Sequence, residues 1–321
     1  MHDTTTTFPT DLLTIDQLSP TTLSRLLDRA AAVKAGEEPA RIDDRTVAMV
    51  FEKPSTRTRT SFEAGVSELG GHPTFLGQDD IHLGHGEPLK DTARALAGYV
   101  DAIVARLNSH DDLVEMAEYA DVPVVNALTD EAHPCQTLAD LLTLRELAAD
   151  CGKDLDEVTL AWVGDGNNVA RSLVIGCALA GVDLHIATPE GYGVDDEALA
   201  AAASLGGEPT CYDSPEAAVA GGERTDGSRS SSDHRSDGAD AVYTDVWVSM
   251  GESEEKLPAF EGFQVDEELL AGGVKLLHCL PAERGREVTD GALESENSVV
   301  WQQAGNRKPT QQALLLELLG E

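Results

Sequence analysis

The sequence predicts an α/β protein built from two doubly wound parallel-sheet domains. Short β-rich runs alternate with helical runs along most of the chain, and this alternation is typical of parallel sheets covered by helices on both faces. The length of 321 residues favours two domains over one. Hydrophobic residues make up 41% of the chain and recur in regular blocks, which indicates packed cores rather than disorder.

The first half of the chain is expected to contain strands that each lead toward a helical run. The strands are predicted at TVAMVF (46–51), DAIVAR (101–106) and VPVVN (122–126), and the helical runs at 60–70, 110–120 and 137–150. The helical run at 137–150 is expected to join the two units.

The second half continues the same alternation. Strands are predicted at 159–164, 183–188, 241–248 and 273–280, and helical runs at 167–181 and 195–207. One segment interrupts the pattern, because GGERTDGSRSSSDHRSDG (221–238) has almost no apolar residues. We expect it to be a flexible surface insertion without a function of its own.

The charge balance excludes two classes of partner. The chain has 23 Lys and Arg against 58 Asp and Glu, a formal net charge of −35, and such a field repels nucleic acid and anionic membrane surfaces. Acidic charge spread so evenly, with few lysines, is typical of proteins adapted to high salt. Five scattered cysteines without a CxxC pair, no signal peptide and no bilayer-spanning segment predict a soluble cytoplasmic protein with reduced thiols.

Polar clusters follow the predicted strands at the points where these strands end. In open α/β sheets, ligands bind outside the carboxyl ends of the strands. A common location for so many polar clusters is therefore the strongest functional signal in the sequence. In chain order the clusters are STRTR (55–59), Arg106, HPCQ (133–136), GDGNN (164–168), DVWVSMG (245–251) and HCLP (278–281).

The STRTR run predicts an anion site at a helix N-terminus. Ser55 and Thr56 are natural N-caps, and the free N–H groups of a first helical turn attract a phosphate. Arg57 and Arg59 face apart on a helix, so we assign Arg57 to the anion and Arg59 to a structural ion pair. The alternative is a capped helix with solvated arginines. A nucleoside triphosphate is not expected, since the GxxxxGK motif of a P-loop is absent.

His133 is the candidate for polarising a carbonyl group. A lone histidine is more often a packed or surface residue, but Pro134 stiffens this loop and Gln136 supplies an amide beside it. Together with Arg106, His133 would stabilise negative charge that develops on a carbonyl oxygen. No histidine has a second ligand at metal-binding spacing, so the sequence predicts no metal.

The GDGNN run is only part of a dinucleotide-binding fingerprint. Val169 stands where the fingerprint needs a third glycine. The amides of Asn167 and Asn168 suit a carboxylate or an amino group better than a pyrophosphate.

The loop after the predicted strand 241–248 points to a ligand that carries an amine. Asp245, Ser249 and Met250 lie in a stretch that has no basic residue from Thr244 to Glu255. Cys279 is a nucleophile or a buried thiol, and burial is the commoner fate of cysteine. With Asp245 available, we expect Cys279 to help remove a proton from an amine.

In this order and at these separations, the clusters resemble those of the ornithine carbamoyltransferases. The resemblance runs from residue 8 to residue 320, interrupted mainly by 221–238, and includes GNRKPT (305–310) near the C-terminus. STRTR and HPxQ are shared with the aspartate carbamoyltransferases, whereas DxxxSMG together with HCLP is more specific to the ornithine enzymes. The loop without basic residues agrees, because an aspartate site must neutralise a second substrate carboxylate.

The resemblance implies a fold and an activity. It implies two α/β domains with the active site in the cleft between them, and transfer of the carbamoyl group from carbamoyl phosphate to the side-chain amine of L-ornithine. It also implies a homotrimer or a larger homo-oligomer and no cofactor or metal. The implied divisions are a carbamoyl-phosphate-binding domain (1–136) on which a C-terminal helix (307–321) packs, a linking helix (137–150) and an ornithine-binding domain (151–306).

The resemblance also implies residue roles. The catalytic set would be Cys279, Arg106, His133 and Asp245. The carbamoyl phosphate set would be Ser55, Thr56, Arg57, Thr58, His82, Arg106, His133, Gln136, Cys279, Leu280 and Arg307, in which His82 would reach a neighbouring subunit's site. The ornithine set would be Asn168, Asp245, Ser249 and Met250.

Three alternatives remain at this stage. A dinucleotide-dependent oxidoreductase would use GDGNN to hold a pyrophosphate. A non-catalytic relative with a regulatory role would have lost site residues, and none is missing here. Putrescine carbamoyltransferases share much of the same residue set, so putrescine stays a candidate acceptor beside ornithine.

Overall fold

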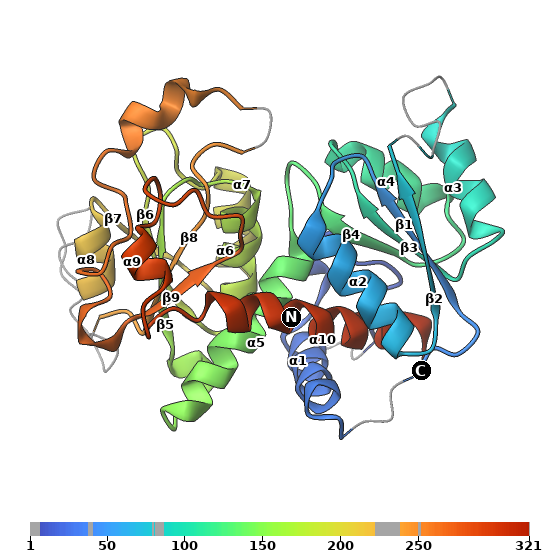
Figure 1. Ribbon diagram of the computed structural model, residues 1–321, viewed down its shortest axis with the longest axis horizontal. Helices are drawn as coiled ribbons and strands as arrows, with labels where there is room; N and C mark the ends of the chain where they lie inside the picture. Colours follow the sequence, from blue (N-terminus) through green and yellow to red (C-terminus); the bar gives the residue numbers. More distant parts are fainter. Residues whose placement is uncertain are drawn as a thin grey trace. The chain divides into compact units, whose positions relative to one another are not determined.

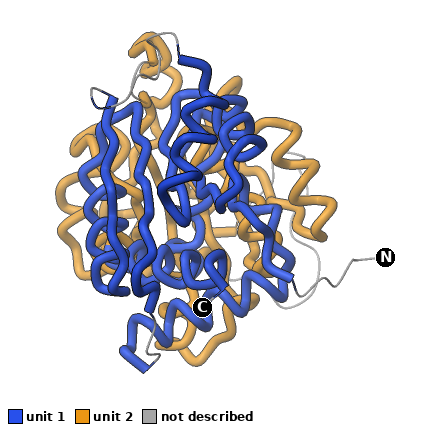
Figure 2. Tube along the Cα trace, turned by 90° about the vertical axis from the view of Figure 1, so that its right-hand side faces the viewer, with its two compact units in different colours: residues 1–142, 305–321 blue, residues 143–304 orange. Residues whose placement is uncertain are grey.

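The computed structural model describes residues 7–37, 41–78, 80, 87–221, 238–249 and 252–320. Its chain divides into two compact units, residues 1–142 with 305–321 and residues 143–304 (Figure 2). His82, Met250 and most of the insertion at 221–238 fall outside the described residues. Each unit contains one parallel sheet with helices around it, which confirms the predicted fold class.

The sheet of the first unit has four parallel strands in the order β2-β1-β3-β4 (Figure 1). The strand at an edge, β2, was not predicted, and it is only half buried, so it lacks the continuous apolar run of its neighbours. The strands are β1 (Thr46–Phe51), β2 (His72–Gly77), β3 (Ala102–Arg106) and β4 (Val124–Leu128).

Helices cover both faces of this sheet, because successive side chains of each buried strand point to opposite faces. Ala48 and Val50 pack with α3 and α4 in one apolar cluster. Phe62 of α2 is buried as well, and α10 contacts α2 through a hydrogen bond from Gln312 Nε2 to the carbonyl of Gly65, 3.2 Å long. The helices of this unit are α1 (Pro20–Ala35), α2 (Thr56–Glu68), α3 (Leu89–Ala97) and α4 (His110–Tyr119).

The sheet of the second unit has five parallel strands in the order β7-β6-β5-β8-β9. The predicted strand at 241–248 ends earlier, at Thr244, because the polar Asp245 leaves the sheet there. The strands are β5 (Thr159–Val163), β6 (Asp183–Ala187), β7 (Thr210–Tyr212), β8 (Ala241–Thr244) and β9 (Lys275–His278).

The second sheet is also covered on both faces. Ala161 and Val163 of β5 belong to a cluster that includes Ala218 of α8 and Leu293 of α9. The alternate residue of β5, Trp162, is buried and therefore faces the other side, which α6 and α7 cover. The helices are α6 (Asn168–Ala180), α7 (Asp196–Ser204), α8 (Pro215–Ala220) and α9 (Asp290–Leu293).

The two boundaries between the units fall inside long helices. They lie within α5 (Pro134–Asp150) and α10 (Val300–Leu319). The last helix begins before the predicted 307 and continues through Pro309. In the part of the chain that the structure describes, no helix is both long and apolar enough to cross a membrane.

Candidate active site

Each sheet reverses its strand order at one point, and four of the predicted polar clusters lie at the ends of the strands there: STRTR, Arg106, GDGNN and DVWVSMG. In the first unit the reversal lies between β1 and β3, where Phe51 pairs with Arg106 at the ends of the two strands. In the second unit it lies between β5 and β8. Ligands of doubly wound sheets bind at such switch points. The polar clusters of the sequence are therefore divided between two sheets.

The STRTR run forms the start of α2. Ser55 is the N-cap, as expected, and its Oγ accepts a hydrogen bond from the backbone N–H of Thr58 at 3.3 Å. Arg59 forms the structural ion pair that the sequence predicted, 3.0 Å from Glu63, and its guanidinium also lies over the ring of Phe75. Arg57 is partly exposed and makes no ion pair within the described part of the chain. Its charge is available for an anion at the helix N-terminus.

Arg307 connects α10 with the other polar groups of the first unit. Its Nη2 donates to Thr58 Oγ1 at 3.0 Å and its Nη1 donates to Gln136 Oε1 at 2.8 Å. Gln136 Nε2 in turn donates to Asp140 Oδ1 at 2.8 Å. A guanidinium only donates and a carboxylate only accepts, so these two partners fix which end of the Gln136 amide faces each of them. All four side chains are buried.

His133 is buried between cationic groups. Burial lowers the pKa of its imidazole well below the ordinary value, and the charges of Arg307 and Arg106 lower it further. The imidazole is therefore neutral near pH 7 and offers an N–H rather than a second positive charge. Arg106 is also buried, at 8% exposure, and retains its charge because a guanidinium does not deprotonate in proteins.

In the second unit, Asn167 connects the loop after β5 with the loop after β8. It caps α6, since its Oδ1 accepts from the N–H groups of Val169 and Ala170 at 2.9 and 3.1 Å. Its Nδ2 donates to Asp245 Oδ2 at 2.8 Å. The sequence had assigned the neighbouring Asn168 to a ligand, whereas Asn167 has a structural role that the polar pattern did not reveal.

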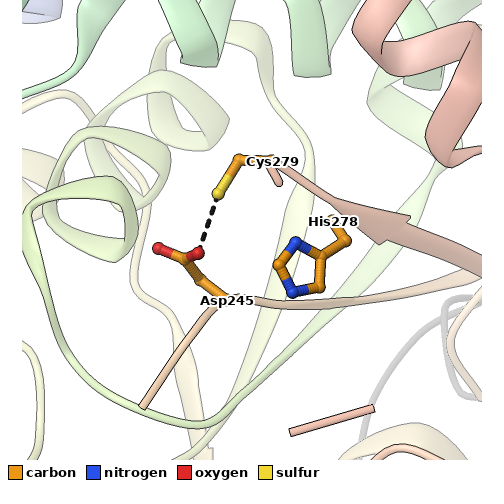
Figure 3. A group of neighbouring side chains, drawn as sticks. All are labelled: Asp245, His278 and Cys279. Carbon is orange, nitrogen blue, oxygen red and sulfur yellow. Dashed lines mark hydrogen bonds between the residues drawn. The ribbon is translucent and has the colours of Figure 1, made fainter. Parts of the chain in front are cut away.

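Asp245 and Cys279 meet because they follow neighbouring strands. Thr244 pairs with His278 at the ends of β8 and β9, and the next residue on each strand turns toward the other (Figure 3). Cys279 Sγ donates to Asp245 Oδ1 at 2.9 Å, and the same oxygen accepts from the N–H of Val246 at 2.8 Å. The carboxylate is 6% exposed and is satisfied by a thiol, an amide and a backbone group.

His278 and Glu287 stabilise the HCLP loop through hydrogen bonds, and sequence reasoning had given neither residue a role. The backbone N–H of Leu280 donates to His278 Nδ1 at 2.8 Å, so Nδ1 carries no proton, and Nε2 therefore donates to Glu287 at 3.1 Å. Leu280 has a φ of 61°, which is unfavourable for a residue with a branched side chain. The bond to His278 holds the loop in this conformation.

Asp245, His278 and Cys279 also form a group that has the donor atoms of a metal site. One ligand atom of each lies within 4.8 Å of the others. Spacing along the chain did not reveal this group, because Asp245 comes from another strand. In the structure the Nδ1 of His278 already accepts a backbone hydrogen bond and the thiol of Cys279 donates to Asp245. A metal would have to replace these bonds.

The loop after β8 is followed directly by a lysine that sequence reasoning left out. The stretch without basic residues ends at Glu255, and Lys256 comes next. Its Nζ lies 3.0 Å from Asp165 Oδ2 and 2.6 Å from Glu252 Oε2. Two carboxylates therefore neutralise this ammonium group.

The structure thus places the predicted residues in two groups. The first unit brings Thr58, Gln136 and Arg307 into direct contact and places His133 within the field of Arg106. The second unit brings Asp245 and Cys279 into contact and places Ser249 in the following loop. No spacing rule signals the contact of Asn167 with Asp245, which joins residues 78 positions apart in the chain.

Comparison with known protein families finds a match for each part of the chain. Residues 10–146 match the family described as aspartate/ornithine carbamoyltransferase, carbamoyl-P binding domain. Residues 156–224 and 225–318 match the one described as aspartate/ornithine carbamoyltransferase, Asp/Orn binding domain. The chain belongs to the aspartate/ornithine carbamoyltransferase family.

Several similar proteins carry a more specific name. A protein named ornithine carbamoyltransferase from Haloquadratum walsbyi is 53% identical over 315 residues, which are 97% of this chain and 98% of the relative. The protein of the same name from Bacillus subtilis is 45% identical over 331 residues, with 99% and 97% covered. The solved structure of ornithine carbamoyltransferase from Pyrococcus furiosus has a TM-score of 0.84 and 41% identity, with 97% of each chain covered.

Proposed function

We propose that this enzyme transfers the carbamoyl group of carbamoyl phosphate to the side-chain amine of L-ornithine, which gives L-citrulline and phosphate. The observation that carries the choice of acceptor is the contact between Cys279 and Asp245 at the carboxyl ends of β8 and β9. A carboxylate and a thiol suit a cationic amine. They do not suit the second carboxylate of aspartate, the other acceptor in the family description.

The phosphate of carbamoyl phosphate is bound at the start of α2. Ser55, Thr56 and Arg57 supply hydroxyl, backbone N–H and guanidinium donors there. Arg57 supplies the positive charge of the set, since Arg59 is held by Glu63. As phosphate leaves, its growing negative charge is stabilised by these donors.

The carbonyl oxygen of the carbamoyl group is polarised by Arg106, His133 and Thr58. The tetrahedral intermediate places negative charge on this oxygen, and buried donors that are already in position stabilise it most effectively. His133 acts as a neutral N–H donor because its pKa is lowered. Thr58 accepts a bond from Arg307, so its hydroxyl proton is left for the carbonyl oxygen.

The carbamoyl NH2 group is recognised by a hydrogen-bond acceptor. The amide orientation imposed by Arg307 and Asp140 makes Gln136 Oε1 such an acceptor, with one lone pair left after its bond to Arg307. We propose the backbone carbonyls of Cys279 and Leu280 as further acceptors for the same group. Gln136 would reject an acetyl group in this position, because a methyl group cannot donate a hydrogen bond.

Ornithine is bound by residues of the second unit. Asn168, Ser249 and Met250 are proposed to hold its α-amino and α-carboxylate groups together with Asp245. The attacking amine must be neutral, and its ordinary pKa is near that of lysine, about 10. Asp245 and Cys279, which are joined by a hydrogen bond from the thiol to the carboxylate, are the groups that take the proton from the amine. The neutral amine then attacks the carbamoyl carbon directly.

An assay with three acceptors tests this assignment. Carbamoylation of ornithine, putrescine and aspartate is measured with carbamoyl phosphate at saturation. Ornithine should be used best, since putrescine lacks the α-carboxylate and aspartate lacks the side-chain amine. Equal or better turnover with aspartate would contradict the proposal. Equal turnover with putrescine would show that the enzyme does not need the α-carboxylate of its acceptor.

We further propose that the enzyme works in the cytoplasm as a homotrimer or a larger homo-oligomer, with His82 donated to a neighbouring subunit, and that it is halophilic. The net charge of −35 opposes assembly at low salt, because the screening length grows from about 3 Å at 1 M to about 30 Å at 0.01 M. Activity and oligomer size should fall together during dialysis into dilute buffer. An intact, fully active oligomer after long incubation there would disprove the halophilic assignment.

A further inference from the structure

Lys256 joins two loops of the second unit that the motifs treat separately. Its side chain is 12% exposed, and its ammonium group lies 3.0 Å from Asp165 and 2.6 Å from Glu252. Asp165 belongs to the loop after β5, and Glu252 belongs to the segment after β8. The lysine is thus a partly buried connection between the GDGNN loop and the segment that carries Ser249.

Each carboxylate bonded to Lys256 is itself connected to a group assigned to ornithine. Glu252 Oε2 accepts from the backbone N–H of Ser249 at 2.8 Å, and the N–H of Glu252 donates to the carbonyl of Ser249 at 3.0 Å. Asp165 is two residues before Asn167, which binds Asp245. Fixing the Lys256 ammonium therefore fixes Ser249 on one side and the start of α6 on the other.

The charges around Lys256 explain why the connection needs a cation. Burial raises the pKa of the Asp165 carboxyl above its ordinary value, the ammonium of Lys256 opposes this, and the carboxylates of Glu252 and Asp245 add to it. Without the ammonium, the carboxylates of Asp165 and Glu252 would repel each other in a partly dry environment. The bond from Asn167 to Asp245 would still join the two loops, but the end of the GDGNN loop at Asp165 would no longer be held to Glu252.

We propose that Lys256 is a positioning residue for ornithine: it holds Ser249 and the GDGNN loop in the arrangement that binds the α-amino and α-carboxylate groups. This inference rests on the proposed function. Lys256 touches no reacting atom, and both of its contacts are with protein carboxylates. Its effect is therefore on the binding of ornithine and not on the binding of carbamoyl phosphate.

The test replaces Lys256 with Met, which keeps most of the side-chain volume and removes the charge. The expected result is a KM for ornithine that rises about tenfold, while the KM for carbamoyl phosphate stays within about twofold. The variant Lys256→Arg restores the charge and should recover most of the lost affinity. The control is Lys153→Met, which removes another Lys–Asp ion pair of the same unit, with Asp240. It should leave both KM values unchanged.

A binding measurement separates positioning from chemistry. L-norvaline has the α groups of ornithine without the side-chain amine, so it binds without reacting. In calorimetry with carbamoyl phosphate present, Lys256→Met should raise the Kd of norvaline by about the same factor as it raises the KM for ornithine. The variant Glu252→Gln changes the exposed partner and should give a smaller loss in the same direction. This second variant keeps the test valid if Lys256→Met fails to fold.

The outcomes distinguish the two proposals. Absence of citrulline formation by the unmodified enzyme would overturn the proposed function itself. An active enzyme whose folded Lys256→Met variant keeps its KM for ornithine would overturn only the role of Lys256. An equal rise of both KM values would also overturn it, since general destabilisation has no preference for one substrate.

Discussion

The polar clusters of the two units differ in the net sign of their buried charge. In the first unit the buried charged side chains of the cluster are Arg106, Arg307 and Asp140, beside an uncharged His133. In the second unit they are Asp245, Asp165 and Glu287. The backbone architecture is nearly the same, so the difference lies in the residues that follow the strands. The comparison teaches that a doubly wound sheet supplies the location of a site, and that loop residues supply its ligand.

The cationic side of this comparison is tested most strongly at Arg57. Arg57→Ala should lower kcat/KM, with a loss of transition-state stabilisation of about 3 kcal/mol or more, because it removes a charge-assisted bond to the leaving phosphate. Steady-state kinetics at a fixed salt concentration measures this loss. Near-normal turnover would show that the start of α2 does not bind the phosphate.

Arg59→Ala is the matched control for Arg57. Arg59 lies two residues along the same helix and contacts Glu63 and Phe75. Removing it should lower the free energy of unfolding by about 1 kcal/mol and leave kcat/KM nearly unchanged. Reversed effects of the two substitutions would exchange their roles.

The acidic side is tested at Cys279. Cys279→Ser should lower kcat roughly a hundredfold, because a hydroxyl exchanges its proton with Asp245 far less readily than a thiol does. The alkaline pH needed for amine deprotonation should also shift, whereas the affinity for carbamoyl phosphate should persist. Cys211→Ser, at an exposed cysteine of β7, is the control. A labelled carbamoyl group trapped covalently on Cys279 would contradict direct attack by the amine.

The contrast between the units was visible in the sequence only in part. The central strands were predicted because they are continuous apolar runs buried on both faces. The edge strands β2 and β7 were missed: β2 is half exposed and begins at His72-Pro73, and β7 has only three residues. Helix α10 begins at Val300, before the start at 307 that the resemblance implied, and it continues through Pro309.

The site was predictable where a single cluster carries the signal. The STRTR helix start and the position of His133 follow from local patterns of caps and strand ends. The contact of Arg307 with Thr58 joins residues 249 positions apart, and that of Cys279 with Asp245 joins residues 34 apart. Such contacts depend on strand order, which local propensity does not contain. The family resemblance had implied the shared roles but not these bonds.

The neutral state of His133 gives a prediction about stability. In the unfolded chain the imidazole has an ordinary pKa of about 6.5 and gains a proton as the pH falls below that value. In the folded protein burial and two arginines keep the pKa well below this. The contribution of His133 is therefore fully present above about pH 6.5 and is lost as the pH falls toward the folded pKa, with a limiting slope of about 1.4 kcal/mol per pH unit.

Denaturant unfolding between about pH 5 and pH 8 measures this slope. His133→Gln should lose less stability on acidification than the unmodified protein does. His72→Gln, an exposed histidine of the same unit, is the control for loss of an imidazole. Equal slopes for the unmodified protein and His133→Gln would show that His133 is protonated in the folded state, and the cationic cluster would then lack its neutral donor.

The smallest effect is expected from the insertion in the second unit, which contrasts with the acidic site of the same sheet. The insertion joins α8 to β8 and therefore enters the sheet at the amino end of a strand, whereas Asp245 follows the carboxyl end. The N–H of Ala239 donates to the carbonyl of Val219 at 2.7 Å, so the described ends of the insertion lie close together. A short Gly-Ser connection can replace residues 222–237 without pulling α8 away from the sheet.

We expect the deletion to leave kcat, both KM values and oligomer size unchanged, as kinetics and light scattering at molar salt would measure. A large loss of turnover with an intact oligomer would show that the insertion influences the site from the opposite end of the sheet. A loss of oligomer size would show that it contacts a neighbouring subunit.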